Sequence, residues 1–297
     1  MKRDPIDTRQ ADQARSVRYS GGFSDVQEAP WFVLGGGGLK GLAHVGALAA
    51  LQEAGIRPAG IVGTSIGALI GALTSAGVTP DEGRTLALKL ERSDILRFNR
   101  RAAWINGIRQ VSLFRAEPLR DYYAEILPSG GWSALQIPFW TNAVDLRDGR
   151  TAWFGPDARM DLSLVDALYA SSALPVFYPP LEQDGRAYID GGTAHPLAMS
   201  KAAEIGAGRI IAVDVGSGQE ADPGGAIGQG MLGIHQRVFS IMTYRRRREA
   251  YESWEGPPML YIRPRLDGYG PFGFEHVEYF LEEGYRATKE ALGWLGS

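Results

Sequence analysis

The hydrophobic residues of the chain fall into short apolar runs, separated by longer stretches in which apolar positions recur every three or four residues. Apolar runs bounded by Gly, Pro or Asp predict buried strands, and the periodic stretches predict helices. The predicted strands are residues 31–34, 59–62, 137–144, 151–154, 181–183, 186–189, 209–215 and 259–262. The predicted helices are residues 42–54, 66–76, 80–90, 163–170, 197–205, 231–254 and 275–295. These elements together predict an α/β protein.

Three segments are less regular. Residues 91–118 mix arginines with aliphatic and aromatic side chains. A cap over a lipid site is one interpretation of them, and ordinary packing of a helical subdomain is the favoured one. Residues 216–230 are rich in glycine and predict a flexible loop. Residues 1–28 are polar and lack an apolar signal segment, so we expect a flexible tail followed by one domain over residues 29–297.

Composition narrows the possible functions only slightly. The chain has 44% hydrophobic and 22% charged residues, as in an ordinary soluble globular protein. Its formal net charge of −3 gives no reason to expect nucleic-acid binding. The absence of cysteine excludes disulfides, thiolate metal sites and cysteine nucleophiles, and it suits a reducing compartment, so we expect a cytoplasmic protein. No apolar run is long enough to predict a transmembrane helix.

Ser65 lies at the centre of the sequence Gly63-Thr64-Ser65-Ile66-Gly67, between a predicted strand and a predicted helix. This G-x-S-x-G pattern is weak by itself in a chain with 39 glycines. Its position fits a nucleophile elbow, in which the two glycines allow a tight strand-to-helix turn. The hydroxyl would then face helix N–H groups that favour developing negative charge. The alternative is a serine that only caps the helix.

The glycine-rich loop at residues 35–41 has three interpretations. A Walker A loop is excluded, because Lys40 stands between Leu and Gly rather than in Gly-Lys-Ser/Thr. A dinucleotide fingerprint is matched literally by Gly36, Gly38 and Gly41, but the next predicted strand ends without the required carboxylate. The favoured interpretation is therefore a third one, an anion-binding loop.

Consecutive glycines expose successive backbone N–H groups that can hold an anionic oxygen. This loop and the Ser65 turn both follow predicted parallel strands, so both should open at the carboxyl edge of one sheet. A nucleophile and an oxyanion hole would then share one site. The alternative is a loop whose glycines serve only close helix packing.

Asp190 follows the predicted strand at residues 186–189 and precedes Gly191 and Gly192. A carboxylate at the end of a strand is a candidate general base. A side chain that only caps the following turn is the alternative.

Four consecutive arginines occupy residues 245–248 of the predicted helix 231–254, with Phe239 and Trp254 in the same helix. One interpretation is contact with anionic lipid headgroups. Because consecutive residues point in different directions around a helix, a solvated surface is the favoured interpretation.

Three motifs occur in a fixed order, GGGLKG at residues 36–41, GTSIG at 63–67 and DGG at 190–192. Together with linking segments at residues 41–48, 171–175 and 212–215, they resemble the patatin-like phospholipase family, specifically its compact bacterial members. The resemblance extends from about residue 29 to the C-terminus. It implies a three-layer α/β/α sandwich with a mostly parallel central sheet.

The resemblance also implies a catalytic Ser–Asp dyad, with Ser65 as nucleophile and Asp190 as base. The oxyanion hole carries over onto Gly36, Gly37, Gly38, Lys40 and Ile66, with backbone N–H groups as donors. The motif glycines are Gly41, Gly63, Gly67, Gly191 and Gly192. We expect a partly desolvated carboxylate, because an ordinary aspartate is a poor base for a serine hydroxyl at neutral pH. No metal or cofactor is required.

Two positions differ from the family pattern. Gly35 stands where the family commonly has an acidic or small polar residue. His195 stands where it often has Asn, and we interpret it as a hydrogen-bonding loop residue rather than a third catalytic residue.

The implied function is a serine acyl hydrolase for lipid or phospholipid esters, of the phospholipase A or lysophospholipase type, with an acyl-enzyme intermediate. Peripheral membrane contact is a further expectation. An acyltransferase or thioesterase would use the same acyl-enzyme, and a non-catalytic lipid-binding regulatory protein would use the same scaffold. The sequence does not indicate an oligomeric state.

Overall fold

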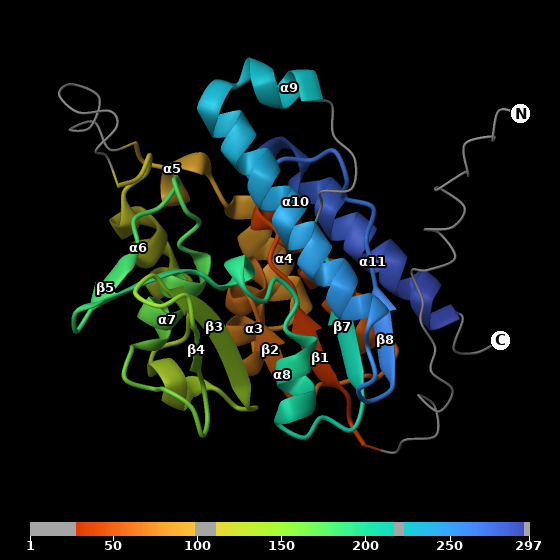
Figure 1. Ribbon diagram of the computed structural model, residues 1–297. Coiled ribbons are helices and arrows are strands. Elements are labelled where there is room, and N and C mark those ends of the chain that lie inside the picture. The colour runs from red at the N-terminus through yellow and green to blue at the C-terminus, as the bar shows by residue number, and fades with distance from the viewer. Residues whose placement is uncertain (1–27, 99–110, 217–222, 294–297) are drawn as a thin grey trace, which may run out of the picture.

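One mixed sheet runs through the computed structural model, which describes residues 28–98, 111–216 and 223–293 (Figure 1). Within these residues, eight strands join in the order β5-β6-β3-β2-β1-β7-β8, and β4 pairs with β3. The strands are β1 (Trp31–Leu34), β2 (Gly60–Gly63), β3 (Phe139–Asp145), β4 (Thr151–Phe154), β5 (Leu181–Gln183), β6 (Arg186–Asp190), β7 (Ile210–Val213) and β8 (Met259–Ile262).

The sheet is parallel in its centre and antiparallel at one side. Strands β3, β2, β1, β7 and β8 run parallel to one another. Strands β4 and β6 pair antiparallel with β3, and β5 pairs antiparallel with β6. The carboxyl ends of the parallel strands therefore share one edge, where α/β folds place their sites.

Alternate residues of the central strands belong to two separate cores. In β1, Phe32 and Leu34 face the larger core and Val33 faces the smaller one. In β2, Ile61 faces the larger core and Val62 faces the smaller one. Fully buried strands of this kind need helices on both faces of the sheet.

Helices cover both faces. The helices are α2 (Ala43–Glu53), α3 (Ile66–Ser75), α4 (Pro80–Lys89), α5 (Arg92–Ile95), α6 (Ala116–Ile126), α7 (Leu164–Ser172), α8 (Met199–Glu204), α9 (Pro223–Gly228), α10 (Gly230–Glu252) and α11 (Val277–Gly293). Side chains of α2, α3, α4, α7 and α11 fill the larger core, whereas α8 and the end of α10 close the smaller one. The three-layer α/β/α prediction is confirmed (Figure 1).

Three helices, α5, α6 and α9, lie where the sequence analysis gave no helix bounds, and α5 lies in the segment 91–118 that it interpreted as a helical subdomain. Helix α6 begins in the irregular segment 91–118 and buries Leu119 and Tyr123, one turn apart, so its periodicity was present but missed. Helix α9 occupies part of the predicted loop 216–230. It packs against α10 so closely that a Cβ on Gly233 would lie 2.4 Å from the carbonyl oxygen of Ala226. Tertiary packing thus overrides the low helix propensity of its glycines.

Parts of three predictions lie outside the described residues. These are residues 1–27 of the predicted tail, residues 99–110 of the irregular segment and residues 217–222 of the predicted loop. In the part of the chain that the structure describes, no helix has both the length and the apolar character needed to cross a bilayer.

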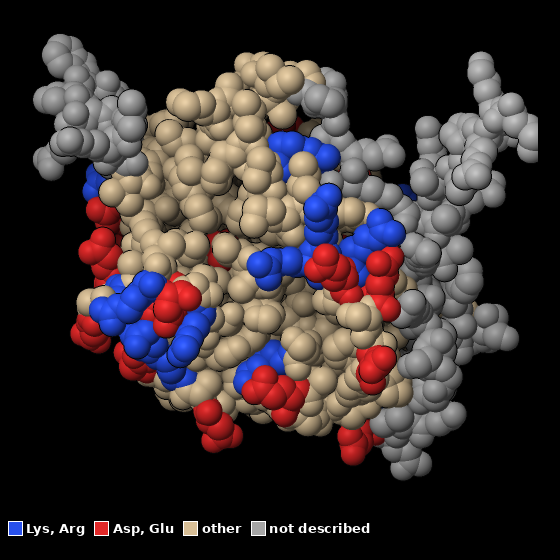
Figure 2. Space-filling view, viewed as in Figure 1, with Lys and Arg blue, Asp and Glu red and all other residues tan. Residues whose placement is uncertain are grey.

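Charged side chains are unevenly distributed over the face seen in Figure 2. They gather over its middle and lower parts, while the surface over α9 and the beginning of α10 is almost entirely uncharged.

Candidate active site

Ser65 lies on the sharp turn that joins β2 to α3. Its φ of 56° belongs to the left-handed region that a serine rarely adopts. The two motif glycines make the turn possible, because a Cβ on Gly63 would lie 2.4 Å from the Gly67 carbonyl oxygen, and one on Gly67 would lie 2.2 Å from that of Leu34. This geometry is that of a nucleophile elbow, and it holds the hydroxyl clear of the sheet.

The register of β3 brings Asp190 to the level of Ser65. On one side of β3, Gly63 lies opposite Thr141. On the other side, Asp190 lies opposite Ala143, two residues further along β3. Since Ser65 is itself two residues past Gly63, both side chains reach the carboxyl edge at the same height.

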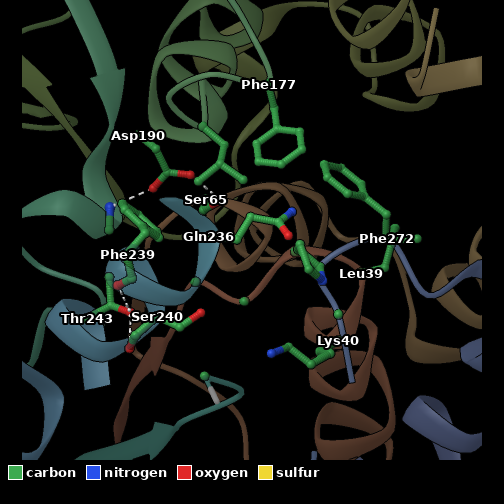
Figure 3. Close-up of a pocket in the computed structure, with 18 of the residues that line it drawn as sticks. Leu39, Lys40, Ser65, Phe177, Asp190, Gln236, Phe239, Ser240, Thr243 and Phe272 are labelled. Carbon is green, nitrogen blue, oxygen red and sulfur yellow. Dashed lines mark hydrogen bonds between the residues drawn. The ribbon is translucent and has the colours of Figure 1, made fainter. Parts of the chain in front are cut away.

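The structure joins the two predicted dyad residues by a hydrogen bond. The Ser65 hydroxyl donates to Oδ2 of Asp190 at 2.8 Å, and the N–H of Gly192 donates to Oδ1 at 2.6 Å (Figure 3). Burial raises the pKa of Asp190 to about 6, although the hydrogen bonds from Gly192 and Ser65 act to lower it. The expected desolvation of this carboxylate is therefore present, and its basicity at neutral pH is greater than that of an ordinary aspartate.

Among the N–H groups of the proposed oxyanion hole, one is used to hold the glycine loop in place. The N–H of Gly36 donates to the carbonyl of Pro196 at 2.9 Å, so it holds the loop in place and is not an oxyanion donor. The N–H groups of Gly37, Gly38 and Ile66 have no acceptor among the described residues. These three are the donors left to hold an anionic oxygen beside Ser65.

Lys40 lines the same cavity as the glycine loop, but its side chain does not lie beside Asp190. Its side chain is only 4% exposed and lies at the opposite end of the pocket from Asp190 (Figure 3). The pKa of Lys40 is lowered to about 8, mainly by burial and to a smaller extent by the positive charge of Arg247. The negative charges of Asp267 and Asp214 act in the opposite direction. The charged neighbours of Lys40 thus come from β7, α10 and the loop after β8, so we place Lys40 in that group of charges.

Asn142 connects the two halves of the candidate dyad and was missed by the sequence analysis. From the middle of the fully buried strand β3, its side chain accepts the Thr64 hydroxyl at 2.9 Å and donates to the Gly191 carbonyl at 3.2 Å. Thr64 precedes Ser65, and Gly191 follows Asp190. An amide in the middle of a fully buried strand was the available signal, because buried polar groups need partners.

Ser171 supports the elbow from α7. Its hydroxyl accepts the backbone N–H of Ser65 at 2.9 Å. This bond satisfies a buried donor next to the nucleophile without using the hydroxyl of Ser65 itself.

His195 serves the loop rather than the dyad, as the sequence analysis preferred. Its backbone N–H donates to the Gly191 carbonyl at 2.9 Å, and its carbonyl accepts the Thr64 hydroxyl at 3.0 Å. Its ring packs on Trp153 with a centroid separation of 5.5 Å. Among the described residues, no cluster of three or more His, Asp or Glu side chains has an arrangement that could hold a metal ion.

A cavity of about 490 Å³ opens beside Ser65 and Asp190, within the usual range for small-molecule sites. One wall is apolar and is formed by Leu39, Ile66, Ile95, Leu119, Phe177 and Phe272. The opposite wall comes largely from α10 and is more polar, with Gln236, Ser240 and Thr243 facing inward beside Phe239 (Figure 3). Arg247 also lines the cavity. The sequence analysis missed this wall, although Gln236, Ser240, Thr243 and Arg247 recur at helical spacing.

Comparison with known proteins shows which proteins this chain is similar to. A model of the patatin-like phospholipase family matches residues 32–200, more than half of the chain. An uncharacterized NTE family protein of Mycobacterium tuberculosis is 37% identical over 192 residues, which cover 64% of this chain and 49% of the relative. Lysophospholipase NTE1 of Coccidioides immitis is 29% identical over 287 residues, which cover 89% of this chain and 17% of the relative. The chain thus spans about half the length of the mycobacterial relative and less than a fifth of the fungal one.

Solved structures give weaker similarities. VipD from Legionella pneumophila aligns with a TM-score of 0.48 and 14% identity, covering 94% of this chain and 70% of VipD. The type III effector protein ExoU aligns with a TM-score of 0.45 and 14% identity, covering 90% of this chain and 53% of ExoU.

Proposed function

The chain belongs to the patatin-like phospholipase family, and from that membership we propose that it is a serine acyl hydrolase of lipid esters, of the phospholipase A or lysophospholipase type. The observation that carries the proposal is the 2.8 Å hydrogen bond from Ser65 to the buried carboxylate of Asp190, at the wall of an apolar cavity. The name of the fungal relatives, lysophospholipase, supports the same substrate class.

In the proposed reaction, Ser65 Oγ attacks the ester carbonyl carbon while its proton passes to Asp190. The negative charge that develops on the carbonyl oxygen is held by the N–H groups of Gly37, Gly38 and Ile66, and a critical donor of this kind contributes ~3–4 kcal/mol. The carbon–oxygen bond to the alcohol then breaks, and the alcohol leaves with the proton from Asp190. Water hydrolyses the acyl-enzyme, again with Asp190 as base.

The two walls of the cavity would bind different parts of the substrate. The apolar wall around Phe177 and Phe272 suits an acyl chain, because burying its methylenes removes apolar surface from water. The α10 wall, with Gln236 and Ser240, offers hydrogen-bonding groups to the polar part of the lipid. Contact with a lipid surface is part of the proposal, since such a substrate resides in membranes or micelles.

Two other functions remain as alternatives to be separated by experiment. An acyltransferase or thioesterase would pass through the same acyl-enzyme, and product analysis with an added alcohol or thiol acceptor distinguishes it. A non-catalytic lipid-binding protein would leave Ser65 unreactive.

The test is labelling of the folded protein with a fluorophosphonate, followed by intact-mass measurement and by assay of fatty acid release from lysophospholipid. We expect one adduct per chain and fatty acid release, with both lost in Ser65→Ala and strongly reduced in Asp190→Asn. An unlabelled Ser65 in folded protein, or full activity in either variant, would contradict the proposal.

A further inference from the structure

The outer face of α9 and α10 carries a row of exposed apolar side chains. Ile227 is in α9, and Met231, Ile234, Val238 and Met242 follow in α10; their exposed fractions range from 49% to 89%. The α10 residues recur every three or four positions, so they lie along one face of the helix. We call these five residues the α9–α10 apolar face.

This part of α10 is apolar on its outer face as well as on its inner face, where Leu232 packs on the core and Phe239 lines the cavity. A helix packed on a core turns its apolar side chains inward. Here Gln236, Ser240 and Thr243 also face the cavity, while isoleucine, valine and methionine side chains face outward. Contiguous exposed apolar surface of this kind marks an interaction site.

Charge distinguishes between the classes of partner. Residues 223–248 contain no Asp or Glu and five arginines, although Asp222 and Glu249 border this stretch. Arg247 is buried against Asp214 and Arg248 pairs with Glu252, so Arg237, Arg245 and Arg246 carry most of the local positive charge. Arg245, Arg246 and Arg248 are exposed in the second half of α10, where Figure 2 shows Lys and Arg side chains below the uncharged surface. The whole chain carries a net charge of −3, so attraction to an anionic surface has to come from this local group. Apolar side chains bordered by arginines complement a bilayer that contains anionic lipids.

Apolar side chains are also exposed near the part of the cavity that Phe177 and Phe272 line. Phe98, Val111 and Val176 are exposed there. Phe98 packs on Phe114, which in turn packs on the cavity-lining Phe177 and Phe272. Exposed apolar side chains therefore occur near the cavity outside the α9–α10 apolar face as well.

We propose that the α9–α10 apolar face, with the neighbouring arginines, docks on the surface of an anionic lipid bilayer and sets the cavity mouth against it. Helix α10 then has two roles, with its outer face in the interfacial region and its inner face lining the cavity. Docking itself does not depend on catalysis; only its consequence, direct entry of the lipid to Ser65, rests on the proposed hydrolase function.

The test is flotation of the Ser65→Ala protein with vesicles, because this variant cannot consume the lipid. We expect flotation with vesicles of phosphatidylcholine and roughly 30% phosphatidylglycerol, weaker flotation with phosphatidylcholine alone, and release by high salt. The double variant Ile234→Asp, Val238→Asp should lower the partition coefficient at least about tenfold, since both side chains lose their apolar contact. Floating but inactive wild-type protein would leave the docking standing and remove the hydrolase proposal alone.

A matched control uses apolar residues of similar exposure away from the cavity. Leu146 and Met160 are 53% and 51% exposed, and Leu146→Asp, Met160→Asp should float like the parent. Equal flotation of both double variants, each shown to be folded by thermal unfolding, would overturn the proposal. A dimer in light scattering that only Ile234→Asp, Val238→Asp converts to a monomer would also overturn it, because a second copy would then cover this face.

Discussion

The guanidinium of Arg247 lies 3.0 Å from the carboxylate of Asp214, and both side chains are at least 96% buried. Arg247 belongs to α10, and Asp214 immediately follows β7. The Tyr261 hydroxyl and the Gly216 N–H also donate to Asp214. Burial alone would raise the pKa of Asp214, but Arg247, Arg263 and these two donors outweigh it, and the pKa lies below the ordinary value. The ion pair thus fixes α10, the polar wall of the cavity, to the central sheet.

This anchor predicts very different costs for two neighbouring arginines. Arg247→Ala leaves the Asp214 carboxylate buried without its ion pair, and should lower the free energy of unfolding by ~3–5 kcal/mol. Arg248 pairs with Glu252 at the surface, and Arg248→Ala should cost less than ~1 kcal/mol. Urea unfolding of both variants measures the difference. Equal costs would mean that the buried pair does not hold α10.

The raised pKa of Asp190 predicts the acid limb of the pH profile. The carboxylate must be ionised to accept the Ser65 proton, and burial raises its pKa to about 6. The rate of fluorophosphonate labelling should therefore rise tenfold per pH unit up to about pH 6 and then level off. With an ordinary aspartate as the base, the labelling rate would already level off at about pH 4. Full labelling rate at pH 4.5 would contradict the assignment of Asp190 as the base.

Asn142 should act on catalysis through position, because it touches the residues beside Ser65 and Asp190 rather than the reacting atoms. Asn142→Ala removes both of its hydrogen bonds, and a small displacement of the dyad can lower kcat by ~10²-fold. We expect KM to change much less than kcat, and unfolding free energy to fall by ~1–3 kcal/mol.

Thr141, the preceding residue of β3, provides the control for Asn142. It is equally buried, and its hydroxyl has no hydrogen-bond partner within the described ranges. Thr141→Val should leave kcat unchanged and stability unchanged or higher. Similar losses of kcat in both variants would show a general sensitivity of the strand instead of a role for the amide.

The sequence predicted features that depend on local patterns. Buried strands such as β1 and β8 and the tight turn at Ser65 follow from apolar runs and glycine spacing. The pairing of Ser65 with Asp190 came from the family resemblance, because the register of β3 that aligns them is set over more than a hundred residues of chain. No local pattern reports such a distance.

The errors have physical reasons as well. Four consecutive arginines favoured a solvated surface, which holds for Arg245, Arg246 and Arg248, but Arg247 shares a helix face with Thr243 and turns inward to Asp214. Gly36 was assigned to the oxyanion hole by the family resemblance, but its N–H is taken by the Pro196 carbonyl. A motif fixes the residue type at a position, but the direction of its donor depends on the packed structure.

Stability should depend on pH differently for the two buried aspartates. The pKa of Asp190 rises from 3.8 to about 6 on folding, so the folded state prefers the neutral acid, and stability is lost as the pH rises between these values. Asp190→Asn removes this loss of stability, so the free energy of unfolding should rise by ~3 kcal/mol at pH 8 and by about half of that at pH 5. The altered hydrogen bonds add a cost that does not depend on pH. Asp214, whose pKa is lowered below the ordinary value of 3.8, stabilises the fold fully at any pH well above that value, so Asp214→Asn should be equally damaging at pH 5 and pH 8. Urea unfolding of both variants and the parent at these two pH values gives the comparison. The same pH trend in both variants would mean that one of the two carboxylates has been assigned the wrong environment.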